Sequence, residues 1–312
     1  VKERLFGYFG AGQSFAKSPS ILSTVDRIDY NNDTATAAVR GPLSVARYGV
    51  AGVSNLNFGY FGGGKDTTPA EVTIVDRIDY SNDTATAVAK GPLSSARYKL
   101  AAVGNSDFGY FAGGASPSNT AKSTVDRLDF ANDVVACVTK GSLSVASYRN
   151  TATGNLSFGY VGGGHPGPGK TIVDRIDYSN DTPTAVAKGN LSVARYRLAA
   201  SGNVNFGYFS GGQGPAGPFS SIDRVDYSSD TATAVAKGPL VRIQYGHAAT
   251  GNTSHGWFGG GYSPGGQESF VDRVDYSNDT ATAISRGPLS AGRQYLGATS
   301  AAANALASKF IG

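Results

Sequence analysis

The chain has 312 residues, of which 40% are hydrophobic, and its 27 Lys and Arg residues face 23 Asp and Glu residues. The apolar content excludes a disordered chain, and no apolar stretch approaches the ~20 residues that a membrane helix needs. The basic residues are dispersed rather than gathered in runs, so the net charge of +4 argues against nucleic acid as a partner. The single cysteine, Cys137, excludes an internal disulfide and a cysteine-based metal site.

Three phrases each recur six times along the chain. Val-Asp-Arg-Ile-Asp-Tyr, or a close variant, places its first aspartate at Asp26, Asp76, Asp126, Asp174, Asp223 and Asp272. Phe-Gly-Tyr-Phe-Gly-Gly-Gly begins at Phe6, Phe58, Phe108, Phe158 and Phe206, with a degenerate copy at His255. Gly-Pro-Leu-Ser-Val-Ala-Arg-Tyr begins, with variations, at Gly41, Gly91, Gly141, Gly189, Gly238 and Gly287. Six copies of each phrase predict six similar structural units.

Each unit reads as four short strands, and the third unit shows the order. Strand A is expected over Tyr98–Val103 and strand B over Phe108–Phe111, with a turn between them. Strand C is expected over Val125–Phe130 and strand D over Val134–Thr139, joined by the turn pair Asn132-Asp133. The runs are short, they are bounded by Gly, Asn or Asp, and no helical period competes with them.

Four strands at a spacing of about 49 residues are typical of a β-propeller blade. The sequence therefore predicts an all-β fold, a six-bladed β-propeller with four antiparallel strands per blade. The ring is expected to close by pairing the N-terminal strands B, C and D with a lone C-terminal strand A over Tyr295–Ala303. We expect a single domain over 1–312, with blade 1 at 5–41 plus 295–304, blade 2 at 48–91, blade 3 at 98–141, blade 4 at 148–189, blade 5 at 196–238 and blade 6 at 245–287.

The repeats resemble those of the kelch family, whose period is about 50 residues. The double glycine after an aromatic strand, the Asp-Tyr strand after a variable loop and the arginine before the innermost strand carry the resemblance. The usual outer-strand tryptophan is missing, and small residues such as Thr84–Val88 stand there. The phrases Val-Asp-Arg-Ile-Asp-Tyr-Ser-Asn-Asp-Thr and Phe-Gly-Tyr-Phe-Gly-Gly-Gly also resemble repeats in structural proteins of marine bacteriophages, which implies a virion-attached protein.

The repeated charged residues are predicted to be framework. A catalytic site needs one asymmetric cluster, whereas Arg27, Asp29 and their counterparts recur in every unit. We expect these two residues to satisfy each other or an adjacent blade. The three histidines, His165, His247 and His255, lie in different units without ligand spacing. We therefore expect no enzyme, no catalytic residue, no cofactor and no metal.

Binding is predicted at the loops that break the symmetry. The loop between strands D and A carries an arginine in four units and Ser147 or Gln244 in the other two; the arginines are Arg47, Arg97, Arg195 and Arg293. The resemblance to the kelch family implies that this loop lies on the same face as the loop between strands B and C, near the channel mouth. Two interpretations stay open: the arginines form a positive funnel there, or each pairs with an acid of the neighbouring blade. The loop between strands B and C varies from unit to unit and offers His165, Phe219 and Tyr262 for stacking.

These observations favour a non-catalytic binding or assembly propeller, virion-associated or extracellular, that docks a protein partner or a surface glycan through these loops. A kelch-type adaptor that recognises an acidic peptide through an arginine-lined channel mouth is the first alternative. A carbohydrate-active enzyme is the second, disfavoured because no paired carboxylates stand outside the repeating framework.

Overall fold

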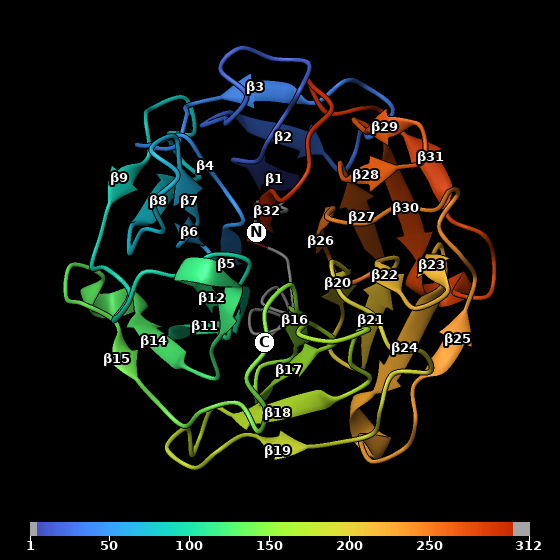
Figure 1. The fold of residues 1–312 in the computed structure, drawn as a ribbon. Coiled ribbons are helices and arrows are strands. Elements are labelled where there is room, and N and C mark those ends of the chain that lie inside the picture. The colour runs from blue at the N-terminus through green and yellow to red at the C-terminus, as the bar shows by residue number, and fades with distance from the viewer. Residues whose placement is uncertain (1–4, 302–312) are drawn as a thin grey trace, which may run out of the picture.

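The computed structural model describes residues 5–301, and these form six four-stranded antiparallel sheets arranged around a central axis (Figure 1). The predicted all-β, six-bladed propeller is therefore confirmed. The described part of the chain holds no α-helix and no helix able to cross a membrane. Its helical elements are single 3₁₀ turns: η1 (Pro117–Asn119), η2 (Phe130–Asn132), η3 (Tyr227–Ser229) and η4 (Tyr276–Asn278).

The two inner strands of each blade contain the small-residue run and the aromatic phrase. The innermost strands, position A, are β5 (Ala51–Ser54), β10 (Ala101–Gly104), β16 (Thr151–Gly154), β20 (Ala199–Gly202), β26 (Ala248–Gly251) and β32 (Gly297–Thr299). The next strands, position B, are β6 (Phe58–Gly62), β11 (Phe108–Ala112), β17 (Phe158–Gly162), β21 (Phe206–Ser210), β27 (His255–Gly259) and β1 (Phe6–Gly10).

The two outer strands of each blade follow the variable loop. Position C is held by β8 (Val75–Asp79), β14 (Val125–Asp129), β18 (Val173–Asp177), β24 (Ile222–Asp226), β30 (Val271–Asp275) and β2 (Val25–Asp29). The outermost strands, position D, are β9 (Val88–Ala89), β15 (Val138–Thr139), β19 (Val186–Ala187), β25 (Val235–Lys237), β31 (Ile284–Arg286) and β3 (Ala38–Arg40).

Blade 1 joins two distant parts of the chain. Its sheet has the order β3-β2-β1-β32, and β1 pairs antiparallel with β32 in the register Tyr8↔Thr299 and Phe9↔Ala298. The expected closure is therefore confirmed, since strand A of this blade comes from the other end of the sequence (Figure 1). Residues 302–304 of the expected blade lie outside the described residues.

Two strand boundaries differ from those expected. Strand D of blade 3 was expected from Val134 but begins at Val138, because Phe130–Asn132 forms η2 and the next residues belong to the turn. The Asp129 side chain caps that turn by accepting a hydrogen bond from the backbone N–H of Ala131, at 2.9 Å. Strand A begins at Ala101 rather than Tyr98, because the preceding residues bend around the axis.

Short two-stranded ribbons rise from one face of the ring. They pair β4 (Arg47–Tyr48) with β7 (Lys65–Asp66), β12 (Ala115–Ser116) with β13 (Thr120–Ala121), β22 (Gln213–Gly214) with β23 (Gly217–Pro218), and β28 (Tyr262–Ser263) with β29 (Gly266–Gln267). This face is built from the loops between positions B and C and the connections from position D to the next position A. We call it the loop face.

Neighbouring blades are joined by a charged cluster that recurs around the ring. In blade 2 the Tyr60 hydroxyl, the Arg77 guanidinium and the Lys90 ammonium reach one carboxylate, Asp133 of blade 3, at 2.9, 2.7 and 3.2 Å. Asp133 is nearly fully buried. The equivalent carboxylates at the other five junctions are Asp83, Asp181, Asp230, Asp279 and Asp33.

These clusters bear out one half of the expected framework network and correct the other. Arg27 reaches the adjacent blade, where its guanidinium binds Asp83 at 2.8 Å. Asp29 does not join this network, because its side chain accepts a hydrogen bond from the backbone N–H of Asn31 and caps the local turn. The blades also touch closely beside the cluster: a Cβ atom on Gly91 would lie 1.8 Å from the carbonyl oxygen of Val135.

Candidate functional site

The four arginines predicted to line a positive funnel are fully buried, so that prediction is wrong. Each forms an ion pair with the first aspartate of the position-C strand in the blade that follows it, as the alternative interpretation holds. The pairs are Arg47–Asp76 at 2.9 Å, Arg97–Asp126 at 2.7 Å, Arg195–Asp223 at 3.2 Å and Arg293–Asp26 at 3.2 Å, all with side chains 0% exposed. They hold the connection from one blade onto the next and are not available to a ligand.

Ser147 and Gln244, which replace the arginine in two blades, are buried as well. Their blades therefore keep a buried aspartate without a guanidinium partner, and burial raises the pKa of both Asp174 and Asp272. Ser147 accepts a hydrogen bond from Asn150, and both amide atoms of Gln244 lack a hydrogen-bond partner within the described chain. The symmetry breaks at these positions inside the framework, not at a surface.

The three aromatic or ring side chains predicted for stacking divide into two groups. Phe219 lies under the guanidinium of Arg195, with 5.3 Å between the guanidinium carbon and the ring centre, and so helps to bury it. His165 and Tyr262 are half-buried on the loop face. His165 packs between Tyr148 and Tyr196, with ring centres 4.9 and 5.2 Å away. All three side chains are half-buried, and their role in stacking on a ligand stays a prediction.

Six residues that sequence reasoning did not single out encircle the axis on the loop face. They directly precede the innermost strands and are Gly49, Lys99, Arg149, Arg197, Gly246 and Tyr295. The backbone N–H of each donates to the carbonyl of the one before it around the axis, and the donor–acceptor distances are 2.7 or 2.8 Å throughout. The ring closes from Tyr295 back to Gly49. We call these six residues the axial ring.

All six residues of the axial ring have positive φ angles, between 56° and 71°. This left-handed conformation suits Gly49 and Gly246, but it costs about 1 kcal/mol for a residue with a side chain. Lys99, Arg149 and Arg197, in three consecutive blades, all adopt this unfavourable conformation. Backbone strain of this kind is concentrated at functional sites in proteins.

The three cations of the axial ring contact aromatic faces rather than carboxylates. The Lys99 ammonium lies 4.3 Å from the ring centre of Tyr98, and the Arg149 guanidinium lies 5.4 Å from that of Tyr148. The Arg197 guanidinium lies 5.4 Å from the ring centre of Tyr295. None of the three forms an ion pair with the described residues 5–301, and the Nε atoms of both arginines are buried without a hydrogen-bond partner there.

The positive charges of the axial ring repel one another, which disfavours the protonated form of the titratable groups beside them. Burial, together with Arg149 and Arg197, lowers the pKa of Lys99 from 10.5 to about 7. Burial and the same two arginines also lower the pKa of His165. Glu71, the carboxylate that acts on Lys99 from the blade 2 loop, is already paired with Lys65 at 3.1 Å. A bound anion would offset the repulsion among Lys99, Arg149 and Arg197.

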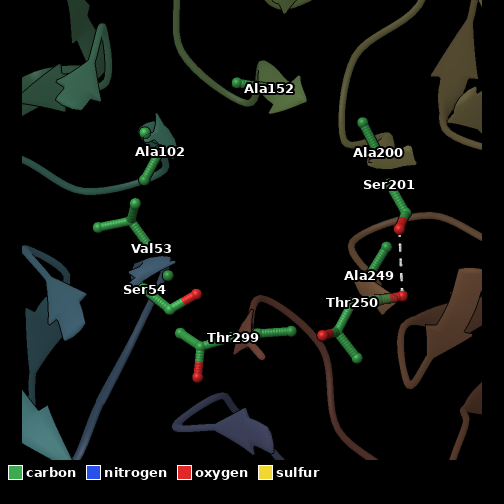
Figure 2. A pocket seen from close by; sticks show the side chains of 12 residues that line it. Val53, Ser54, Ala102, Ala152, Ala200, Ser201, Ala249, Thr250 and Thr299 are labelled. Carbon is green, nitrogen blue, oxygen red and sulfur yellow. Dashed lines mark hydrogen bonds between the residues drawn. The ribbon is translucent and has the colours of Figure 1, made fainter. Parts of the chain in front are cut away.

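The axial ring surrounds a depression that leads into a narrow channel. Under the ring lie Val50, Leu100, Asn150, Leu198, His247 and Leu296, one from each blade. Below them the channel is lined by the innermost strands, mostly by Gly, Ala, Ser and Thr residues together with Val53. Figure 2 shows the far end, where Ala102, Ala152 and Ala200 face the axis and Ser201 donates to the carbonyl of Thr250. We call the depression on the loop face the axial mouth.

The signal that would have located this site is variation, not repetition. The phrase reads Ala-Arg-Tyr-X in three units, and a tyrosine precedes X in all units but the last, where Gln294 takes its place. The residue at X varies most and is Gly49, Lys99, Arg149, Arg197, Gly246 or Tyr295. The arginine before the tyrosine was predicted to line the mouth because it recurs in four units. The residue after the tyrosine is the one that reaches the axis.

Neither known family models nor curated proteins provide a match to this sequence. The kelch and bacteriophage resemblances thus rest on the repeat phrases alone, and the six-bladed β-propeller is the level at which the fold is established. Within the described residues, no group of three or more His, Cys, Asp or Glu side chains could hold a metal ion.

Proposed function

We propose that this protein is a non-catalytic binding or assembly propeller that docks a partner on its loop face, with the axial mouth at the centre of the contact. The partner is a protein in a larger assembly or a surface glycan. A virion-associated or extracellular setting suits this role, and the resemblance of the repeats to phage structural proteins supports it.

The observation that carries the proposal is the group of three uncompensated cations in the axial ring. Twelve other arginine and lysine side chains recur around the framework and meet a carboxylate of an adjacent blade. Lys99, Arg149 and Arg197 instead converge on one another in a strained backbone. Such an arrangement lowers the stability of the fold, and a bound acidic group would offset that loss by pairing with the cations.

The alternative of an adaptor that reads an acidic peptide through an arginine-lined mouth loses its original support, because Arg47, Arg97, Arg195 and Arg293 are buried in ion pairs. The alternative of a carbohydrate-active enzyme has no observation in its favour.

A binding screen of the labelled protein against intact bacterial cells and a glycan array tests the proposal. We expect saturable binding that falls at least tenfold in the double variant Arg149→Gly/Arg197→Gly. These substitutions place at two positions the residue that the chain itself has at Gly49 and Gly246, so the backbone should accept them.

The matched control is Lys17→Gln, which removes one exposed charge from the loop between β1 and β2. It should bind as the parent protein does. Saturable binding that survives the double variant unchanged would move the docking site away from the axial mouth.

A further inference from the structure

We infer that the axial mouth binds a sugar acid, with its carboxylate held among Lys99, Arg149 and Arg197 and its hydroxylated ring lying across the glycine side of the axial ring. This inference rests on the proposed function and specifies its ligand. Four features of the mouth lead to it.

The first feature is the uneven distribution of charge around the axis. The cations occupy three consecutive blades, whereas the opposite half of the ring has Gly246, Tyr295 and Gly49. A charged group is therefore attracted to one side of the mouth only. Arg149 is the middle cation, and within the part of the chain that the structure describes its guanidinium has aromatic neighbours but no carboxylate in an ion pair. A single carboxylate between these groups would form charge-assisted hydrogen bonds with donors that lack a charged partner.

The second feature is space on the other side. A Cβ atom on Gly246 would lie at ordinary van der Waals distance, 3.5 Å, from a carbon of the Tyr295 ring, so no atom blocks a ligand carbon at this position. Tyr295 is half-buried, and its ring meets both Lys99 and Arg197 across the mouth. A compact ring attached to the carboxylate can thus lie over Gly246 against the face of Tyr295. The shape suits one small cyclic group.

The third feature is the chemistry of the rim. Half-buried tyrosines pack against residues of the axial ring: Tyr48 against Tyr295, Tyr196 beside Arg149 and Tyr245 beside Arg197. Tyr262 and His165 contact Tyr245 and Tyr196 in turn. A tyrosine offers an apolar face and a hydroxyl that can both donate and accept. Sugars present apolar C–H faces and hydroxyls in the same way. An inorganic anion would use the cations alone and leave these aromatic groups without a role.

The fourth feature concerns the backbone and argues against an extended peptide. Peptides that add to a sheet edge need free main-chain donors and acceptors. Here the six N–H groups nearest the axis are all engaged in the closed hydrogen-bond ring. Recognition at the mouth must therefore come from side chains, as it does for a sugar.

Lys99 makes the binding sensitive to pH. The groups around it are Arg149, Arg197, the Lys65–Glu71 pair, Asn119 and the phenols of Tyr48, Tyr98, Tyr148 and Tyr295. His165 has a pKa below 6.5 and is neutral above that pH, and the pKa values of Tyr98 and Tyr295 are raised. With a pKa of about 7 in the free protein, Lys99 loses its charge as the pH rises from 6 to 9, so affinity for an anion should fall over that interval.

Isothermal titration with sodium glucuronate tests the inference, with glucose, acetate and inorganic phosphate as comparison ligands. We expect one site per chain, at least tenfold tighter binding of glucuronate than of acetate or phosphate, and no measurable binding of glucose. An oligosaccharide that contains glucuronate, titrated alongside, distinguishes a polymer-borne residue from the free sugar by its higher affinity.

Variants place the site. Arg149→Gly should weaken glucuronate binding at least tenfold, and Lys99→Gly should also remove the fall in affinity between pH 6 and 9. Lys17→Gln should bind as the parent protein does. Melting temperatures of all variants, measured in parallel, separate lost binding from lost folding.

The inference is overturned if phosphate, acetate or a short polyglutamate peptide binds as tightly as glucuronate, if glucuronate does not bind, or if Arg149→Gly leaves its affinity unchanged. None of these results would remove an Arg149-dependent binding to cells or particles, so the proposed function would stand with a ligand of another class.

Discussion

The inter-blade clusters and the axial ring occupy equivalent places in all six blades, yet they use their charges in opposite ways. At the junctions, each cluster brings a cation from one blade to a carboxylate of the next, and the residue types hardly change around the ring. In the axial ring, only the backbone hydrogen bonds repeat, and the side chains differ from blade to blade. The repeating residues build the ring. The varying residues of the axial ring reach the loop face, whereas Ser147 and Gln244, which vary at another repeated position, are buried in the framework.

The same distinction applies to burial. Asp133 and its counterparts are less than 10% exposed, and each lies within 4 Å of two cationic side chains of the preceding blade, so their charge is satisfied inside the protein. Lys99, Arg149 and Arg197 are half-buried and form no ion pair with a carboxylate among residues 5–301. Removing a junction residue should therefore damage the fold, whereas removing an axial cation should not. Three measurements of stability test this contrast.

The largest effect is expected for Asp133→Ala at the junction of blades 2 and 3. It leaves Arg77 and Lys90 without their carboxylate and Tyr60 without its acceptor, which should cost about 3–5 kcal/mol of unfolding free energy. Urea denaturation measures the loss. Asp129→Ala, which removes only an exposed turn cap four residues earlier, should cost about 1 kcal/mol. A smaller loss for Asp133→Ala than for Asp129→Ala would contradict the framework assignment.

A gain of intermediate size is expected for Gln244→Arg, which gives Asp272 the partner that four other blades possess. A charged hydrogen bond to a buried carboxylate, less the cost of burying the guanidinium, should add about 1–2 kcal/mol at pH 7. Burial raises the pKa of Asp272 above 3.8 in the folded protein, so folding favours the protonated carboxyl. The stability that this group contributes is therefore present below pH 3.8 and is lost as the pH rises through the raised pKa of the folded state.

The advantage of Gln244→Arg over the parent protein should therefore grow as the pH rises from 4 to 7, which urea denaturation at several pH values can follow. Gln244→Leu is the control, because it removes the buried amide without supplying a charge. An equal gain from both substitutions at every pH would show that the amide, and not the unpaired carboxylate, limits stability there.

The smallest effect is expected for Lys99→Gly. Glycine adopts the positive φ of this position without strain, and the substitution relieves the repulsion from Arg149 and Arg197. Stability at pH 7 should stay equal or rise by less than about 1 kcal/mol. Thermal unfolding of this variant beside Asp133→Ala gives the contrast directly. A loss above about 2 kcal/mol would make Lys99 a structural residue.

The fold could be predicted because it depends on what repeats. Six copies of each phrase, strands bounded by glycine and Asn-Asp turns, and a lone strand A near one end specify both the number of blades and the way in which blade 1 closes. Local propensities and the global arrangement agree, as they do in natural sequences. Only the ends of strands, such as the late start of β15, depended on turn geometry that the sequence pattern does not resolve.

The site could be predicted only in part, and the reason is the direction of side chains in one short segment. Arg97 and Lys99 are two residues apart, and their separation by Tyr98 does not reveal which of them turns inward. The positive φ of Lys99 bends the chain so that Arg97 is buried against Asp126 while Lys99 meets the axis. A conformation that a lysine adopts rarely could not be expected from propensity. The placing of the B–C and D–A loops on one face agrees with the pairing of β4 with β7, whereas a stacking role for His165 and Tyr262 stays a prediction.

The hydrogen-bond ring around the axis has a consequence for how such repeats can multiply. Each blade contributes one donor and one acceptor, and six steps bring the last residue back within 2.7 Å of the first. A seventh unit inserted by duplication would push these groups apart and break the circuit of backbone hydrogen bonds nearest the axis. The hydrogen-bond ring therefore favours six blades: a ring of five or seven similar repeats would lose some of these hydrogen bonds and be less stable.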